Sequence, residues 1–452
     1  MTLYYSTNRA VPDVKLDHAL LQGQAGDKGL YMPRNIPRVS VDFLRRARDM
    51  DYPEIAAAVL EPYAEGVFTR KELDEICYEA YDYPVPLENV TSNSYVMRLD
   101  QGPTASFKDF AARFMGRALG RLVRRRGKGL LILTATSGDT GSAISHAFLG
   151  VENIQILVLF PREEVSDRQR KQMTTLGDNV ATMAVEGKFD DCQALVKRAF
   201  ADPDLASLNL SSANSINIGR LLPQSVYYIY SACRTADVAG GEEVVFSVPS
   251  GNFGDLLGGV LAYKGGLPIK RFVVATNEND EVPRFLDTGV YEKIVPSRVC
   301  ISNAMNVGHP SNLARLVDLY GGWMDETGKL KVPPNMEKMK EDFFGVSIDD
   351  EKTRETIGRV YKDYSTTLEP HGAVGWAGLE SYYERFREEV GVTAISLETA
   401  HPAKFPDEIR DITGEDPALP PSLEGLETLS ESYGEMDVDY GAFKELLEKR
   451  YG

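Results

Sequence analysis

Short apolar runs alternate with stretches of helical periodicity along the middle of the chain. After one of these runs, Cys192, Leu195, Val196 and Ala199 recur at the spacing of a single helix face. Strands that alternate with helices form crossover units and a mostly parallel sheet, so the pattern predicts an α/β fold. Ligands bind such sheets beyond the carboxyl ends of the strands, which directs attention to the loops after them. The runs predicted to be buried strands are 130–134, 156–160, 180–185, 208–211, 244–248, 272–275 and 392–397.

The two ends of the chain are less regular. Turns and helices are expected over residues 1–90, where Thr69 and Glu72 have the spacing of a capping box and Phe68 and Leu73 that of a hydrophobic staple. Residues 423–452 form an acidic tail with a helical pattern. The predicted organisation is an N-terminal helical and hairpin region, a smaller α/β domain and a larger α/β domain that includes the tail, with bounds 1–90, 91–235 and 236–452.

Composition narrows the class of protein. The 452 residues are 43% hydrophobic and 26% charged, as in an ordinary globular protein with room for two or three domains. Fifty basic and 67 acidic residues give a net charge of −17. This balance argues against nucleic acid or an anionic membrane as a partner. An anionic substrate would need a local cationic pocket.

The cysteines and histidines show no metal-binding pattern. Cys77, Cys192, Cys233 and Cys300 lie far apart, and the five histidines never form an HExxH motif. We therefore expect no metal and a reducing compartment. The first residues lack the charged and apolar segments of a signal peptide, and no apolar run approaches the roughly eighteen residues of a membrane span. A cytoplasmic protein is expected.

The segment 103–109, PTASFKD, is the most informative of the chain. Its Lys108 lies where a Pro/Thr/Ser loop meets an amphipathic helix. A lysine forms an imine only through its neutral amine, and burial beside a side chain such as Phe107 would disfavour the charged form. Alone, the tripeptide Phe-Lys-Asp would more often be a surface lysine at a helix start. Two loops further along the chain change that interpretation.

Both loops follow predicted strands. Residues 136–142, TSGDTGS, place hydroxyls and backbone amides at a helix start, which suits a carboxylate or phosphate, although a plain helix cap is equally compatible. Residues 250–255, SGNFGD, could hold a phosphate on their amides, or form a simple tight turn. The second loop is not a GxGxxG fingerprint, and Gly129 after Lys128 rules out a Walker loop.

Two more segments carry polar groups that could converge on a ligand. In 214–220, NSINIGR, the amides, hydroxyl and guanidinium suit an oxyanion, with a helix cap and a solvated arginine as the alternative. In 398–405, ETAHPAKF, Thr399 follows a predicted strand and could bond a ring nitrogen, or simply cap the next turn.

Taken together, these segments resemble threonine synthases, which belong to the tryptophan-synthase-β superfamily of pyridoxal-phosphate enzymes. The matching segments run in a consistent order over about the first 405 residues: YYST, GLYMP, PTASFKD, TSGDTG, NSINIGR, SGNFGD and TAHPAKF. The resemblance implies two α/β domains with mostly parallel sheets and an N-terminal, mainly helical segment.

The resemblance also implies residue roles. Lys108 would hold pyridoxal phosphate as the Schiff-base lysine, and Thr399 would meet the ring nitrogen. The cofactor phosphate would rest on Ser250, Gly251, Asn252, Phe253, Gly254 and Asp255. The substrate's carboxylate would lie beside Ser137, Asp139 and Thr140, and its phosphate beside Ser215, Asn217 and Arg220.

One implied position departs from the wider superfamily. Much of it has asparagine where this chain has Asp139, close to the phenolate oxygen of the cofactor. Two anionic oxygens repel, so either a proton is shared or Asp139 points elsewhere. Lys404 has no implied role; it could add positive charge to the pocket or be exposed.

The implied activity is the last step of threonine biosynthesis, in which O-phospho-L-homoserine and water give L-threonine and inorganic phosphate. It would proceed by γ-elimination and β-addition of water, in a monomer or homodimer with a small-molecule substrate. The alternative in the same superfamily is a threonine or serine dehydratase, which does not need Arg220. A silent ligand-binding relative would have lost the lysine or the phosphate loop, and a nucleotide-binding module lacks its motifs here.

Overall fold

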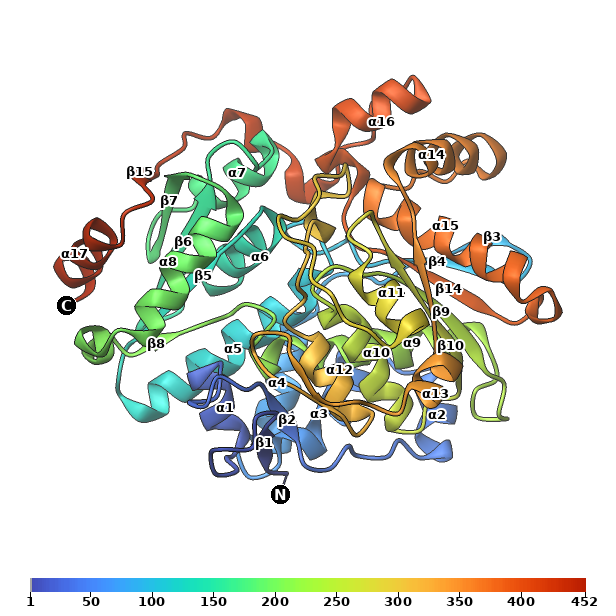
Figure 1. Ribbon diagram of the computed structural model, residues 1–452, viewed down its shortest axis with the longest axis horizontal. Helices are drawn as coiled ribbons and strands as arrows, with labels where there is room; N and C mark the ends of the chain where they lie inside the picture. Colours follow the sequence, from blue (N-terminus) through green and yellow to red (C-terminus); the bar gives the residue numbers. More distant parts are fainter. Residues whose placement is uncertain (1) are drawn as a thin grey trace.

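Two sheets with helices packed on them organise the computed structural model, which describes residues 2–452 (Figure 1). The larger sheet has the order β13-β10-β9-β14-β4-β3 and is parallel except for the antiparallel pair β3–β4. The smaller sheet, β15-β7-β6-β5-β8, is parallel throughout. The predicted α/β class with mostly parallel sheets is confirmed.

All seven predicted strands are present. They are β5 Leu130–Ala135, β6 Ile154–Pro161, β7 Val180–Glu186, β8 Leu210–Ser211, β9 Val244–Pro249, β10 Ile269–Thr276 and β14 Ala394–Glu398. The sheets also contain β3 Leu87–Thr91, β4 Ser94–Arg98, β13 Phe343–Ser347 and β15 Gly434–Asp437. Two small pairs lie outside them, β1 Tyr4–Ser6 with β2 Tyr31–Pro33 and β11 Trp323–Met324 with β12 Leu330–Val332.

Both faces of the smaller sheet are covered. On β5, Leu131 and Leu133 pack with α8 and α17, whereas Leu130 and Ile132 belong to the main core with Phe148 of α6. Alternate residues of a strand point to opposite faces, so this division follows from the strand period. Strands buried on both sides are apolar at nearly every position, and in β5 the single exception is Thr134.

The helices fill the space around the sheets, with α15 packed on β9, β10 and β14. Those of the first half are α1 Leu16–Gln22, α2 Val41–Ala47, α3 Tyr52–Ala64, α4 Arg70–Ala80, α5 Lys108–Arg126, α6 Asp139–Phe148, α7 Asp167–Thr174 and α8 Phe189–Ala201. Then follow α9 Ser225–Thr235, α10 Gly254–Lys264, α11 Glu281–Thr288, α12 Leu313–Leu319, α13 Met336–Asp342, α14 Asp350–Tyr364, α15 Pro370–Arg385, α16 Pro406–Thr413 and α17 Tyr440–Tyr451.

The predicted start of α4 is confirmed. The Thr69 hydroxyl accepts a bond from the N–H of Glu72, and the Glu72 carboxylate accepts one from the N–H of Thr69 at 2.9 Å. The same helix buries Leu73, Ile76, Cys77 and Ala80 in the main core.

The domain bounds at residues 90 and 235 stay a prediction, because each sheet draws strands from separate stretches of the chain. β4 lies in the larger sheet beside β14, and the C-terminal β15 pairs with β7 at the edge of the smaller sheet. In Figure 1 the C-terminal helix α17 accordingly lies next to α8, away from α14 and α15. None of the helices formed by residues 2–452 has the length and apolar composition of a membrane span.

Candidate active site

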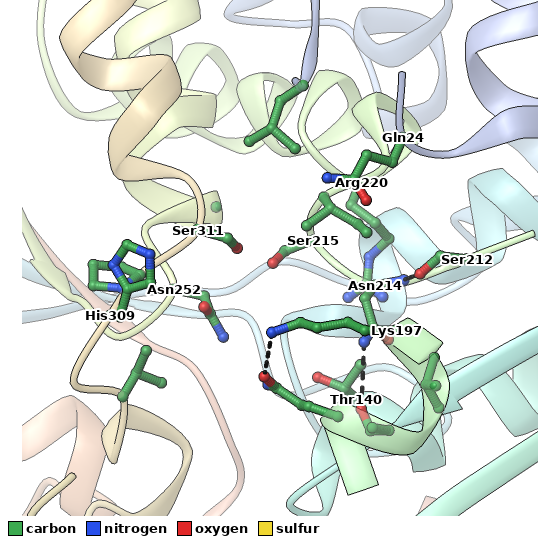
Figure 2. A pocket seen from close by; sticks show the side chains of 18 of the residues that line it. Gln24, Thr140, Lys197, Ser212, Asn214, Ser215, Arg220, Asn252, His309 and Ser311 are labelled. Atoms are coloured by element: carbon green, nitrogen blue, oxygen red, sulfur yellow. Dashed lines mark hydrogen bonds between the residues drawn. The ribbon is translucent and has the colours of Figure 1, made fainter. Parts of the chain in front are cut away.

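A cavity of about 1150 Å³ opens at the carboxyl ends of strands from both sheets. Loops that directly follow β5, β9 and β14 border it, as the parallel topology predicts. Ser215, Asn252 and Ser311 lie around the same space, near Arg220 and Asn214 (Figure 2). Of the residues predicted from the sequence, those lining the cavity are Lys108, Ser137, Asp139, Thr140, Ser215, Arg220, Thr399 and the whole loop 250–255.

Lys108 is the first residue of α5, and its place is set by the loop before it. The N–H of Phe107 donates to the carbonyl of Thr399 at 2.9 Å, and the N–H of His401 donates to the carbonyl of Ala105 at 3.0 Å. Ala105 adopts a left-handed conformation with φ of 53°. The lysine is thereby anchored to the loop that follows β14.

The surroundings of Lys108 favour its neutral amine. Its side chain is 12% exposed, and Nζ lies 4.7 Å from the centre of the Phe107 ring. Burial is the main cause that lowers the pKa of Lys108, while Asp139, 3.5 Å away, opposes that shift. The direction agrees with the expectation from the sequence.

The loop after β5 is folded around Thr136. Its hydroxyl oxygen accepts bonds from the N–H groups of Gly138 at 3.0 Å and Gly141 at 2.8 Å. Gly138 has φ of 137°, and a Cβ there would lie 2.5 Å from the side chain of Gln169, so this position requires glycine. The arrangement leaves Ser137 and Thr140 at the cavity.

Asp139 faces two lysines at the start of α6. Its Oδ1 accepts from Lys404 Nζ at 2.6 Å and from Gln169 Nε2 at 2.8 Å, and its Oδ2 lies 3.5 Å from Lys108 Nζ. Burial by itself would raise the pKa of Asp139, but Lys404 and Lys108 more than offset it and hold that pKa well below its usual range. Asp139 is therefore an ionised carboxylate, and Lys404 is fully buried rather than exposed.

The loop 250–255 leads into α10 in a shape that leaves backbone N–H groups free. Phe253 adopts the left-handed conformation, with φ of 63°, directly before Gly254 begins the helix. The first N–H groups of a helix have no acceptor within it, and its dipole favours an anion there. A Cβ on Gly251 would lie 2.9 Å from the carbonyl oxygen of Ala304, so the loop packs closely on its neighbour. These features suit a phosphate group.

Asp255 anchors this loop to α9. Its Oδ1 accepts from the hydroxyl groups of Tyr227 at 2.6 Å and Tyr228 at 2.8 Å, both on α9. Its Oδ2 is buried without a partner, and burial raises the pKa of Asp255 to about 6. An anionic carboxylate repels phosphate, so this geometry favours an anchoring role for Asp255 over direct phosphate contact.

The segment 214–220 is divided between the cavity and the core. Ser215 lies beside the glycine loop, with its Cβ 3.5 Å from the place where a Cβ of Gly254 would be. Asn217 does not line the cavity. Its amide nitrogen donates to the carbonyls of Leu20 and Ser212, and its amide oxygen accepts from the N–H of Gly219. Its hydrogen-bonding groups thus hold the chain.

Arg220 is a buried cation at the cavity wall. Its Nη1 donates to the carbonyl of Ala213 at 2.8 Å, whereas its buried Nε has no partner. Burial lowers the pKa of Arg220 to about 10, so the group remains charged at neutral pH. A buried charge with an unused donor indicates a site for an anion.

Arg315 was not singled out from the sequence, although it supports Ser215. This fully buried side chain donates to the carbonyls of Tyr31, Ser215 and Ile216 and to Asn312 Oδ1. All of its N–H groups are used, so it acts as a fixed clamp on the segment that carries Ser215. The backbone carbonyls that it binds are distant in sequence, and no local motif reveals them.

Glu369 and His371 were also missed. The hydroxyl of Thr399 donates to Glu369 Oε1 at 3.3 Å, and the N–H of Ala304 donates to His371 Nε2 at 3.1 Å. The ring Nδ1 of His371 must then carry the proton that is shared with Glu369. His371 lines the cavity beside Thr399. A proline after an acid, as in Glu369-Pro370, is a helix-start signal that could have drawn attention to this group.

Further polar side chains that line the cavity include Lys197, His309 and Ser311 (Figure 2). Within residues 2–452, no cluster of three or more histidine, cysteine or acidic side chains is arranged to hold a metal ion.

Comparison with known proteins places the chain among related sequences over its whole length. A family described as "Pyridoxal-phosphate dependent enzyme" matches residues 82–396, "Threonine synthase N terminus" matches 3–81, and "Threonine synthase, C-terminal" matches 372–447. The threonine synthase of Escherichia coli K12 is 38% identical over 96% of this chain and 96% of its own. The threonine synthase of Pseudomonas aeruginosa is 38% identical over 94% of this chain and 93% of its own.

Solved structures agree with the sequence relatives. A threonine synthase from Brucella melitensis, described as bound to pyridoxal phosphate, superposes with a TM-score of 0.91 and 34% identity over the whole of both chains. The threonine synthase structure from Escherichia coli superposes with a TM-score of 0.88 and 37% identity, and the match covers 99% of this chain and 100% of that one. A threonine deaminase from Solanum lycopersicum shares the fold alone. It is 17% identical, with a TM-score of 0.54, and the match covers 78% of this chain and 93% of its own. The chain belongs to the threonine synthase family of pyridoxal-phosphate-dependent enzymes.

Proposed function

We propose that the chain is a threonine synthase, which converts O-phospho-L-homoserine and water to L-threonine and inorganic phosphate with pyridoxal phosphate as cofactor. The observation that carries this proposal is the pairing, in one cavity, of a lysine amine held toward its neutral form and a buried arginine with an unused donor. A phosphorylated amino acid presents an α-proton that the neutral amine of Lys108 can take and a phosphate that Arg220 can bind. A dehydratase acting on threonine would leave the arginine unpaired.

The residues present fit the cofactor. Lys108 can bind its aldehyde, and the free N–H groups at the start of α10 can hold its phosphate beside Gly251, where a side chain would not fit. Thr399 offers a hydroxyl for the ring nitrogen, and that hydroxyl is itself bonded to Glu369. When bound, pyridoxal phosphate supplies a ring that withdraws electrons and stabilises negative charge on the carbons of the substrate.

The other predicted residues divide into substrate contacts and supports. Ser137 and Thr140 lie at a helix start and are proposed to bind the carboxylate of the substrate, and Ser215 with Arg220 its phosphate. Asn217 is proposed to hold the backbone of its segment, because its amide is used by Leu20, Ser212 and Gly219.

Lys108 and Arg220 are proposed to take part in the chemical steps of the reaction. The neutral amine of Lys108 can take the proton from the α-carbon of the substrate and deliver protons elsewhere on the carbon chain. Arg220 stays charged at neutral pH and can stabilise the phosphate as the bond to the γ-carbon breaks. Water then adds at the β-carbon, and its oxygen becomes the hydroxyl of threonine.

Incubation of the purified, cofactor-loaded protein with O-phospho-L-homoserine tests the activity. Phosphate and threonine should appear in equal amounts, and a parallel reaction with threonine alone should release no 2-oxo acid and ammonia. Release of a 2-oxo acid from threonine, without turnover of the phosphorylated substrate, would instead establish the dehydratase.

The surroundings of the enzyme in the cell are proposed on simpler grounds. Its four cysteines are unpaired and buried, which agrees with a cytoplasmic protein. A monomer or a homodimer is proposed, and sedimentation at micromolar concentration distinguishes the two.

A further inference from the structure

Lys404 is a buried lysine to which the proposed reaction assigns no role. It ends the short 3-10 helix Pro402–Lys404, which follows the Thr399 loop, and its side chain has no exposed surface. Its Nζ donates to Asp139 Oδ1 at 2.6 Å and to the carbonyl of Thr104 at 3.0 Å. Lys404 does not line the cavity, whereas Asp139 does.

The two oxygens of Asp139 have different neighbours. Oδ1 is occupied by Lys404 and by the amide of Gln169, and Oδ2 is directed toward Lys108. The carboxylate therefore reaches the amine of Lys108 with one oxygen while the other is held from behind. The ion pair also joins a loop after the larger sheet to the first residue of α6, which packs on the smaller sheet.

We propose that Lys404 is a positioning residue of the active site: by pairing with Oδ1 of Asp139 it keeps that carboxylate ionised and aimed at Lys108, and balances its charge there. This inference rests on the proposed function only in taking Lys108 as the residue that binds the cofactor. Together, Lys404 and Asp139 carry no net charge, as a single neutral side chain in the position of Asp139 would. Unlike such a side chain, the pair also presents a carboxylate oxygen that can align a proton on the Lys108 nitrogen.

Packing alone does not explain the pair. Bringing two charges into the interior costs free energy that their attraction seldom repays, and apolar residues of similar size often serve stability as well. The bond of Lys404 to Thr104 would also be available to an uncharged donor. What an uncharged side chain could not supply is the balancing charge beside an aspartate that faces the reacting amine.

The sign of the effect follows from the charges that face Lys108. These are Asp139, which favours a proton on the amine, and Lys404 and Arg220, which disfavour it. Burial raises the pKa of Asp255, which lines the same cavity, and Lys108 offsets only part of that rise. Removing the charge of Lys404 should make the Lys108 nitrogen hold its proton more tightly. Removing the charge of Asp139 should make it hold the proton less tightly.

The main experiment is a pH titration of the visible absorption of the cofactor-loaded protein, in which the cofactor is bound to Lys108. We expect Lys404→Met to raise the midpoint by about one pH unit or more, a tenfold change in proton affinity, and Asp139→Asn to lower it by a similar amount. Lys404→Arg keeps the charge and should stay within about 0.3 pH unit of the parent protein. Lys264→Met removes a half-buried lysine on α10 away from the cavity and is the matched control.

A second measurement does not depend on the cofactor. The reactivity of the Lys108 amine toward a small acylating reagent, followed by mass spectrometry of its peptide as a function of pH, reports the same proton affinity in the cofactor-free chain. Lys404→Met should move this profile upward, and the double variant Lys404→Met/Asp139→Asn should return it to within about 0.5 pH unit of the parent, since both charges are gone.

The outcomes separate the two proposals. Profiles of Lys404→Met and Asp139→Asn that both match the parent within about 0.3 pH unit would overturn the role of Lys404. If Lys404→Met does not fold, Asp139→Asn and the double variant test the role of Lys404. Only a charge-balancing role predicts that the pH profile of Lys108 moves downward in Asp139→Asn and returns toward that of the parent in the double variant. A parent protein that binds no cofactor at Lys108 would refute the proposed function instead, and the reactivity profiles would still test the ion pair.

Discussion

The backbone N–H of Phe107 donates to the carbonyl of Thr399 over 2.9 Å, and so joins the loop that carries Lys108 to the end of β14. A second bond, between His401 and Ala105, and the isolated bridge between Ser106 and Ala400 complete the connection. The proposed cofactor lysine and the proposed partner of the ring nitrogen therefore belong to one hydrogen-bonded unit. A displacement of either would move the other.

Replacing Lys108 by alanine should abolish covalent cofactor binding. In the parent protein, borohydride should fix the cofactor on the peptide that contains Lys108, because its amine is largely buried whereas the other lysines of the cavity, Lys28, Lys197 and Lys293, are exposed. The variant should show no such adduct, and its formation of threonine should fall by at least about 100-fold, since it also lacks the proposed base. Peptide mapping after reduction makes the measurement, with Lys264→Ala as the control. A reducible adduct that persisted in Lys108→Ala would assign the role to another lysine.

Arg220 should matter more for the substrate than for the cofactor. Loss of a charge-assisted bond to phosphate is worth about 2 kcal/mol, so Arg220→Ala should raise the KM for O-phospho-L-homoserine by about 10- to 100-fold. The affinity for pyridoxal phosphate, measured by fluorescence titration, should change by less than about threefold, because the start of α10 is proposed to hold that phosphate. Equal losses for both ligands would place Arg220 at the cofactor phosphate.

The α/β fold could be predicted from the sequence because its strands are buried on both faces. Runs such as 130–134 and 244–248 are apolar except for one hydroxyl residue each, Thr134 and Ser247, and each ends at the cavity loop that was expected to follow it. β15 escaped prediction for the opposite reason: it is a short edge strand of sequence GEMD whose pairing with β7 stabilises it. An edge strand needs only one apolar face, or none, so no periodic signal marks it.

The site could be predicted where a residue acts through its own loop, and not where it acts through distant partners. Lys108, at the start of α5, and Thr399, directly after β14, lie at ends of elements that sequence alone identifies, and both line the cavity. Asn217 has the same kind of side chain as a ligand-binding residue, yet it turns inward to bond Leu20, far away in the sequence. The pairing of Lys404 with Asp139 likewise depends on two loops meeting in space.

Arg315 should be essential for the shape of the substrate side of the cavity. Arg315→Met leaves the carbonyls of Tyr31, Ser215 and Ile216 without their buried donor, which should lower the free energy of unfolding by about 3 kcal/mol. Arg315→Lys should recover only part of this, because an ammonium group cannot make the same set of bonds. Urea denaturation of both variants makes the comparison, with the exposed Arg124→Met as the control. Unchanged stability in Arg315→Met would show that these carbonyls find other donors.

Glu281 should make stability depend on pH in a direction opposite to that of a paired carboxylate. It is the first residue of α11, only 1% exposed, with Oε2 unpartnered, and burial raises its pKa to about 8 from the ordinary 4.5. Between these two values the folded chain holds a proton that the unfolded chain has released. The contribution of Glu281 to stability is therefore complete below pH 4.5, declines as the pH rises and reaches its minimum above pH 8.

Glu281→Gln removes this titration while keeping the size of the side chain. The variant should match the parent at about pH 5 and be more stable by about 2 kcal/mol at about pH 9, as judged by the urea midpoint at each pH. Glu337→Gln, at an exposed position in the first turn of α13, should shift neither midpoint and serves as the control. A difference between Glu281→Gln and the parent that is the same at both pH values would mean that Glu281 ionises freely in the folded protein, with its Oε2 reached by water.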